Sequence, residues 1–196
     1  YTDWYENGQI KTDANYKDGK EDGKFTTWYE NGQITLERNY KDGERDGKWT
    51  EWYGNGQIEV EATFKDGAGT YLQFYENRQL NIEGDYKDGK VHGKWTDWDE
   101  DGQITLERNY KDGKLDGKWT WWNKKGQKDE ELNYKDGDLV SATRYNYYDN
   151  GQIKSKNNYK DDRLNGKSTF WNKNGQKFGE GNYKDGKLDG KWTWWN

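Results

Sequence analysis

The 196-residue sequence contains no cysteine, no proline and no methionine. The lack of cysteine excludes a disulfide framework, a thiolate nucleophile and a zinc–cysteine site. The lack of proline means that no position is barred from a β-ladder for want of an N–H donor. Because no initiator methionine is present, we expect a processed chain or a cut fragment, and the missing end is a place where a targeting signal can be lost.

Long hydrophobic runs are also missing. No apolar stretch approaches the roughly 20 residues that span a bilayer, and no signal-peptide pattern is present. Hydrophobic residues make up 29% of the chain and charged residues 35%. This composition excludes a thick aliphatic core, but the 13 Trp and 16 Tyr residues also exclude a disordered coil, because disordered chains are poor in aromatic residues.

The charge is mixed and has no strong excess of one sign. The 32 basic residues stand against 37 acidic residues, for a formal net charge of -5. Nucleic acids and anionic membranes are bound mainly through an excess of positive charge. We therefore expect no nucleic-acid partner, and a membrane surface is disfavoured.

A period of 24 residues runs through the whole chain. A turn glutamine recurs, with steps of 24 residues apart from one step of 22 and one of 25, at Gln9, Gln33, Gln57, Gln79, Gln103, Gln127, Gln152 and Gln176. The short step falls at Ala68-Gly69 and the long step at Asp138–Ser141, in or just after a turn. The period predicts one repeat array over residues 1–196, with about eight units and both ends cut within a unit.

Each unit carries two hairpin signals, Asn-Gly and Asp-Gly, which suit two-residue type I′ turns. The runs between them alternate with period two, which is typical of strands and not of helices. The prediction is an all-β, elongated, single-layer antiparallel meander of stacked hairpins, about 16 strands in all, twisted or trough-like. With Asn31-Gly32 as a two-residue loop, Tyr29 is expected to oppose Ile34 and Trp28 to oppose Thr35. The same register pairs Gly23 with Tyr40, an arrangement typical of aromatic cover of a strand glycine.

Alternation divides the aromatic side chains into two stripes. The richer stripe comprises Phe25, Trp49, Tyr71, Trp95, Trp119, Trp192, Tyr16, Tyr40, Phe64, Tyr86, Tyr110, Tyr134, Tyr159 and Tyr183. The other face carries one aromatic residue per unit, which we call the contact row: Trp4, Trp28, Trp52, Phe74, Trp98, Trp122, Tyr147, Trp171 and Trp195. Tryptophan anchors are frequent at interfaces, so this row is the candidate binding site. The competing interpretation is that the row only shields the backbone of a single-layer sheet.

Residues with catalytic or metal-binding chemistry are sparse. The sequence offers His92, its single histidine, no cysteine, no nucleophilic serine motif and no second histidine as a catalytic or metal-binding partner. We therefore interpret His92 as a turn residue. The Asp-Gly-Lys-x-Asp-Gly loops carry oxygen ligands of the type that calcium prefers, but lysines crowd them and hairpin chemistry already explains them. Repeated carboxylates such as Glu37 and Glu61 are expected to face Lys or Thr across a strand and not to hydrolyse glycosides. No cofactor, metal or catalytic residue is predicted.

The unit G-K-W-T-x-W-Y-x-N-G-Q-I-x-x-E-x-N-Y-K-D-G-K resembles the bacterial variant of the MORN repeat, the MORN_2 type. The resemblance covers essentially the whole chain and departs from the pattern at Arg78, Asp162 and Ser168. It implies a sheet of stacked hairpins and a non-catalytic scaffold, often self-paired end to end. Some bacterial relatives carry an antitoxin label or lie at the cell surface, and some eukaryotic relatives are attached to lipid kinases or credited with phospholipid binding.

These observations predict a non-enzymatic scaffold for protein–protein contact, with a bacterial surface, secreted or cytoplasmic location left open. The alternatives are an antitoxin or immunity-type protein that binds a toxin, and a carbohydrate-binding module that uses the contact row. Open sheet edges also make self-association a candidate. The partner, the full number of repeats and the oligomeric state do not follow from the sequence.

Overall fold

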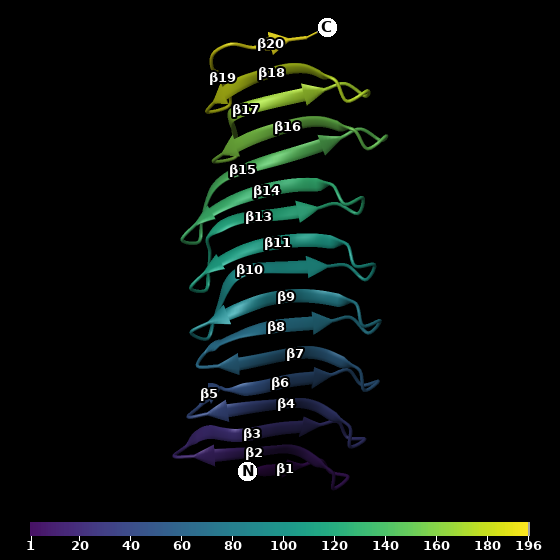
Figure 1. The fold of residues 1–196 in the computed structure, drawn as a ribbon, viewed down its shortest axis with the longest axis vertical. Helices are drawn as coiled ribbons and strands as arrows, with labels where there is room; N and C mark the ends of the chain where they lie inside the picture. Colours follow the sequence, from purple (N-terminus) through teal and green to yellow (C-terminus); the bar gives the residue numbers. More distant parts are fainter. Residues whose placement is uncertain (196) are drawn as a thin grey trace. The chain divides into compact units, whose positions relative to one another are not determined.

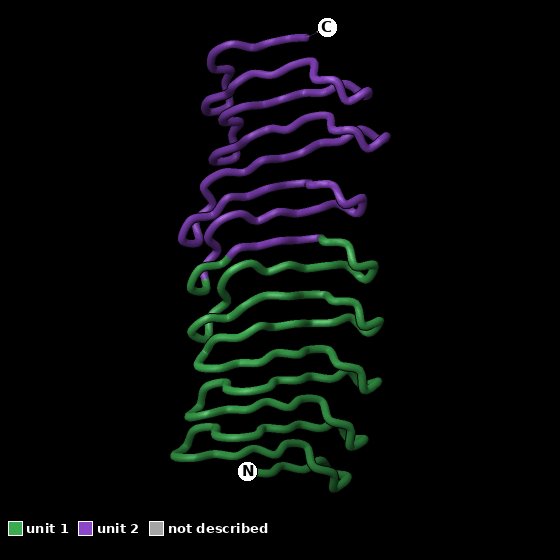
Figure 2. The backbone as a smooth tube through the Cα atoms, in the orientation of Figure 1, with its two compact units in different colours: residues 1–104, 110–113 green, residues 105–109, 114–196 purple. Residues whose placement is uncertain are grey.

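The computed structural model describes residues 1–195, which contain twenty β-strands and no helix. Consecutive strands pair antiparallel in chain order, as in β2 with β3 and β3 with β4, so the predicted all-β meander is confirmed (Figure 1). The chain divides into two compact units, coloured in Figure 2. Unit 1 comprises residues 1–104 and 110–113, and unit 2 comprises residues 105–109 and 114–196.

Unit 1 contains the strands β1 Thr2–Trp4, β2 Ile10–Lys17, β3 Lys20–Trp28, β4 Ile34–Lys41, β5 Glu44–Arg45, β6 Gly47–Trp52, β7 Ile58–Lys65, β8 Ala68–Phe74, β9 Leu80–Lys87 and β10 Lys90–Trp98. The strand β11, Ile104–Lys111, contributes residues to both units. Unit 2 contains β12 Lys114–Leu115, β13 Gly117–Trp122, β14 Lys128–Lys135, β15 Asp138–Tyr147, β16 Ile153–Lys160, β17 Arg163–Trp171, β18 Lys177–Lys184, β19 Lys187–Leu188 and β20 Thr193–Trp194.

The Asp-Gly turns are the two-residue hairpins that the sequence predicts. In the turn between β4 and β5, Asp42 has φ 52° and Gly43 has φ 89°, and the flanking Lys41 and Glu44 pair directly. A left-handed conformation at both central residues is what a type I′ turn requires. Asp tolerates this conformation better than most residues, because its side chain bonds locally.

The Asn-Gly loops differ from the predicted type I′ turn. Only Gly32 is left-handed there, and the loop spans residues 29–33, because the Tyr29 N–H donates to the Gln33 carbonyl. The Asn31 side chain accepts the Gln33 N–H at 3.0 Å, which stabilises the longer loop. The register on either side therefore shifts: Trp28 opposes Ile34 and not Thr35, and Tyr29 lies in the loop. Further from the loop, the predicted pair of Gly23 with Tyr40 is confirmed, and Phe25 opposes Arg38.

The strand count exceeds the predicted 16 because a bulge divides some strands in two. At Asp46 the backbone N–H bonds the Asn39 carbonyl at 3.0 Å, and Gly47 adopts φ 98°. The Asn39 side chain donates to the Lys48 carbonyl at 2.8 Å and holds the bulge. The same break separates β12 from β13, where the Asn109 amide reaches the Lys118 carbonyl at 2.7 Å.

Ring contacts take the place of an aliphatic core on the richer stripe. In unit 1, Trp49 packs against Phe64 and Tyr71, with ring centroids 5.9 Å apart in both pairs. Tyr71 in turn stacks on Trp95 at 5.7 Å. Each such pair adds about 0.5–1.5 kcal/mol beyond the area that it buries. The buried cluster around Trp49 and Phe64 shows that one aromatic stripe supplies the core of this unit.

Candidate functional site

The contact row occupies one structural position throughout the described chain. Its first eight members are the last residues of their strands: Trp4 of β1, Trp28 of β3, Trp52 of β6, Phe74 of β8, Trp98 of β10, Trp122 of β13, Tyr147 of β15 and Trp171 of β17. Trp195 directly follows β20. The repeat therefore places one aromatic ring at the start of every Asn-Gly loop.

Isoleucine side chains join the row, which the sequence interpretation did not foresee. The register shift places Ile10 opposite Trp4, Ile34 opposite Trp28 and Ile58 opposite Trp52. These three isoleucines are 41%, 36% and 38% exposed. The recurrent Gln-Ile dipeptide was the available signal, but a two-residue loop would have placed the isoleucine opposite the wrong residue.

The tryptophans themselves are mostly half-buried. Only the first and last members are exposed, Trp4 at 56% and Trp195 at 40%. Two residues before each tryptophan lies a threonine on the same side of the strand, and Thr26, Thr50 and Thr96 are buried. The row aromatics thus lie on the same side as buried threonines and are themselves partly exposed.

Ion pairs flank the row in both units. In unit 1, Lys24 pairs with Glu37, and Lys48 pairs with Glu61 at 2.9 Å. In unit 2, Lys167 pairs with Glu180 at 3.0 Å. These contacts agree with the expectation that Glu37 and Glu61 face lysine across a strand.

Among the carboxyl groups of these ion pairs, Glu131 has the pKa that is shifted most. Burial alone would raise its pKa, but hydrogen bonds from Lys128 at 2.7 Å and Tyr145 at 2.5 Å, together with the charges of Lys128 and Lys118, lower the pKa to about 2. The ionised carboxylate is therefore the stable form across the physiological range, and it acts as a structural anchor and not as a general acid.

The repeats differ in the residue that lies opposite the row aromatic on the neighbouring strand. In two repeats of unit 2, lysine takes the isoleucine position, so Lys128 opposes Trp122 and Lys177 opposes Trp171. In the repeat between them, Ile153 opposes Tyr147. The Lys177 ammonium lies 4.1 Å from the centre of the Trp195 ring, within cation–π distance. The apolar Trp–Ile combination is accordingly a feature of the first repeats of unit 1.

A hydrogen bond that recurs from repeat to repeat joins the loops of adjacent repeats within each unit. The tyrosine after the row aromatic donates its hydroxyl to the backbone carbonyl of the next row member, as Tyr5 does to Trp28 at 2.7 Å and Tyr75 to Trp98 at 2.8 Å. In unit 2, Tyr148 bonds Trp171 at 2.9 Å. This role of the Trp-Tyr dipeptide was missed, because a two-residue loop would have left the tyrosine in a strand.

The residues considered for catalysis or metal binding come together in no site. His92 Nδ1 lies 3.6 Å from an Asp112 carboxylate oxygen, beyond hydrogen-bonding distance. Across residues 1–195, no three His, Cys, Asp or Glu side chains are placed to hold a metal ion. Nor does this part of the chain contain a helix long and apolar enough to cross a membrane.

Comparison with known proteins identifies the repeat. The family model described as MORN repeat variant matches seven segments, residues 1–18, 21–42, 45–66, 91–112, 115–136, 142–161 and 164–185. No curated protein matches the sequence. Among solved structures, the crystal structure of TarM is similar at 13% identity and a TM-score of 0.30, over 61% of this chain and 20% of that chain. The chain thus spans about a fifth of the TarM chain, and a likeness of this degree establishes no shared fold.

Proposed function

The chain belongs to the MORN repeat variant family, and we propose that it is a non-catalytic scaffold whose contact row binds a protein partner. MORN repeats commonly form scaffolds that bind proteins or membranes. The observation that carries the proposal is the exposed isoleucine beside each tryptophan at the start of unit 1. An isoleucine is not needed there to shield the sheet, because two repeats of unit 2 have lysine in the same position, while the repeat between them keeps Ile153.

The composition of this surface supports a protein partner. Tryptophan is enriched among residues that dominate binding energy, and such anchors lie within a more polar rim. Here Trp28 and Ile34 form an apolar pair, and the Lys24–Glu37 ion pair lies across the same two strands. The next repeat presents the same arrangement with Trp52 and Ile58.

The chain itself supplies substitutions for the test. In the variant Ile34→Lys/Ile58→Lys, each isoleucine is replaced by the residue that two repeats of unit 2 carry at that position, so the fold is expected to persist. A matched control is Lys65→Ala/Lys87→Ala, which alters two exposed strand-end residues at the turn edge of unit 1. Partners captured from bacterial extract on the wild-type chain are purified and titrated against all three proteins by calorimetry.

We expect binding to be weakened roughly tenfold or more by Ile34→Lys/Ile58→Lys and to be unaffected by the control. Equal affinity for both variants would overturn the proposal. Recovery of one small protein as the sole partner would identify the narrower antitoxin or immunity role. Binding of the labelled chain to intact cells tests the narrower proposal of a surface role.

A second candidate is an extended glycan along the contact row. Two shallow hollows adjoin row members on this face, one of about 320 Å³ beside Trp98 and one of about 370 Å³ beside Trp171. Both contain lysine and glutamate next to the ring, a combination able to bind hydroxyl groups. Glycan binding that is lost on Trp98→Ala/Trp171→Ala would favour this candidate over a protein partner.

A further inference from the structure

Five loops contain an exposed asparagine that is directly followed by glycine: Asn7-Gly8, Asn31-Gly32, Asn55-Gly56, Asn150-Gly151 and Asn174-Gly175. Asparagine is among the thermally labile residues. When glycine follows it, the glycine backbone nitrogen can attack the side-chain amide carbon, because glycine has no Cβ atom to obstruct ring closure. These dipeptides are therefore candidate sites of a spontaneous chemical modification.

The attacking nitrogen is held in the same way in all five loops. Each glycine N–H donates to the carbonyl of the residue three positions earlier, at 2.9 Å in every case. Each glycine is also left-handed, with φ 83° in four of the loops and 80° at Gly175. Any difference in reactivity between the loops therefore has to come from the asparagine side chain.

Four of the five asparagine side chains are held by hydrogen bonds. In each of them the Oδ1 atom accepts the N–H of the glutamine two residues later, as Asn55 accepts from Gln57 at 2.9 Å. A second bond, donated by Nδ2, is made by Asn7, Asn31 and Asn150. Ring closure turns the face of the amide toward the following nitrogen and expels Nδ2, so these bonds oppose it.

Asn174 is the exception among the five. In its loop, Asn172 stands where five other loops have tyrosine, and its Oδ1 atom accepts the N–H groups of Asn174 at 3.0 Å and Gln176 at 3.1 Å. Asn123 bonds two loop N–H groups in the same way in another repeat. The glutamine N–H is thus already bonded, and within residues 1–195 the Asn174 side chain makes no hydrogen bond.

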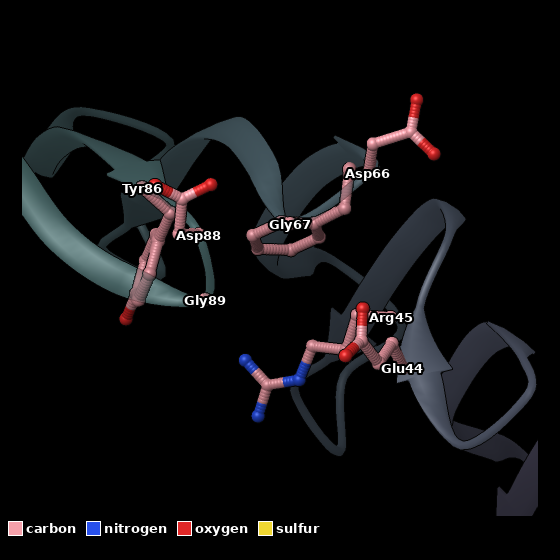
Figure 3. Close-up of a pocket in the computed structure, with 8 residues that line it drawn as sticks. Glu44, Arg45, Asp66, Gly67, Tyr86, Asp88 and Gly89 are labelled. Carbon is pink, nitrogen blue, oxygen red and sulfur yellow. The ribbon is translucent and has the colours of Figure 1, made fainter.

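Other glycine-containing dipeptides are less suited to this reaction. The sixth Asn-Gly dipeptide, Asn165-Gly166, is half-buried within strand β17, where its glycine pairs with Tyr183. At the opposite edge of the strands aspartate precedes glycine, as in Asp66-Gly67 and Asp88-Gly89, two turns shown in Figure 3. A carboxyl group has no ammonia to release, so ring closure and reopening at these turns would leave the charge of the chain unaltered.

We propose that Asn174 is the first asparagine of the folded chain to lose ammonia, becoming aspartate or isoaspartate. The Gly175 nitrogen forms a bond to Asn174 Cγ, the Cγ–Nδ2 bond breaks, and Nδ2 leaves as ammonia with the proton of the Gly175 N–H. Water then adds to either carbonyl carbon of the resulting imide and opens the ring. The modification goes beyond the proposed scaffold function, and it places a new negative charge three residues after Trp171 of the contact row.

The test uses the loops as controls for one another. Asn172→Tyr gives this loop the residue that five other loops carry, so the Asn174 side chain is expected to take over the bond from the Gln176 N–H. Tyr53→Asn makes the reverse exchange in the loop of Asn55. The folded wild-type chain and both variants are incubated in mildly alkaline buffer. Peptide mapping by mass spectrometry measures the loss of amide and the isoaspartate content at every Asn-Gly dipeptide.

Two controls separate the effect of the fold from that of the local sequence. In a parallel incubation in urea the five loop dipeptides should react at similar rates, because each is followed by glutamine and none is held. Circular dichroism and thermal melting verify that the variants are folded. If Tyr53→Asn is unfolded through loss of the hydroxyl bond to the Phe74 carbonyl, Asn172→Tyr decides the outcome alone.

In the folded wild-type chain we expect Asn174 to react roughly fivefold faster than Asn55, which corresponds to the net contribution of one hydrogen bond. Asn172→Tyr should slow Asn174 to the rate of Asn55, and Tyr53→Asn should speed Asn55 to the rate of Asn174. Equal rates at the two asparagines in the folded wild type overturn the proposal. It is also overturned by an unaltered Asn174 rate in folded Asn172→Tyr, or by the same difference between the two sites in urea.

Discussion

Glu131 is the residue whose charge contributes most clearly to stability. Its pKa falls from an ordinary value of 4.5 to about 2, because the bonds from Lys128 and Tyr145 and the lysine charges outweigh the effect of burial. The ionised group stabilises the fold above the ordinary pKa, and this stabilisation is lost as the pH falls from about 4.5 to about 2. We expect Glu131→Gln to lower the free energy of unfolding at pH 7 by about 1–3 kcal/mol and to flatten its decline over that window, measured by urea unfolding.

Glu61 provides the matched control for this experiment. It pairs with Lys48 as Glu131 pairs with Lys118, but its side chain is 37% exposed against 10% for Glu131. Glu61→Gln should change stability by less than about 1 kcal/mol and leave the acid dependence intact. An equal effect of both substitutions would show that the network around Glu131 has no special role.

Asp162 is the second central residue of its hairpin turn, where the other seven Asp-Gly turns have glycine. Its φ of 57° is left-handed, a conformation that costs a side-chain-bearing residue more than it costs glycine. We expect Asp162→Gly to raise the free energy of unfolding by about 0.5–1 kcal/mol. The reverse change in the next unit, Gly186→Asp at φ 82°, should lower it by a similar amount. Thermal melting measures both, and a lower melting temperature for Asp162→Gly would contradict the strain argument.

At the scale of the hairpin, the sequence predicted the backbone conformation of the Asp-Gly turns correctly and that of the Asn-Gly loops incorrectly. The Asp-Gly turns form as predicted, since two adjacent left-handed residues leave little alternative. The Asn-Gly loops do not, because the Asn31 side chain bonds the Gln33 N–H and only Gly32 is left-handed. That bond depends on side-chain geometry, so composition could not reveal it. The resulting shift also concealed the isoleucines beside the contact row and the loop tyrosines.

The strand glycine Gly84 shows how closely a ring can lie over a backbone. A Cβ atom there would lie 2.1 Å from the Trp95 ring, so the ring would have to move. We expect Gly84→Ala to lower the free energy of unfolding by about 1–3 kcal/mol through overpacking. Gly54→Ala is the control, because a Cβ atom at Gly54 meets nothing within 4 Å. Chemical denaturation compares the two, and similar stabilities would contradict the aromatic cover of Gly84.

For the whole molecule, repeats that contact only their neighbours should respond locally to damage. Gly84→Ala should reduce hydrogen-exchange protection in β8, β9 and β10 and leave β16, β17 and β18 unaltered. Gly181→Ala should do the reverse, because a Cβ atom there would lie 2.2 Å from the Trp192 ring. Mass-spectrometric exchange on the folded chain measures both patterns. A uniform loss of protection over both units would contradict nearest-neighbour stability.

The hydroxyl bond between adjacent loops has a consequence for how such a protein lengthens. Tyr5 reaches the Trp28 carbonyl at 2.7 Å across 23 positions, and Tyr53 reaches the Phe74 carbonyl at the same distance across only 21. The hydrogen bond between adjacent loops thus keeps its length in the shortened repeat, because the two missing residues are removed at the Asp-Gly turn edge. Duplication of a 24-codon segment would insert one more repeat. Its loop tyrosine would donate to the row carbonyl of the next repeat, and its own row carbonyl would accept from the tyrosine of the preceding repeat. The gene can therefore add or remove modules without evolving a new contact each time.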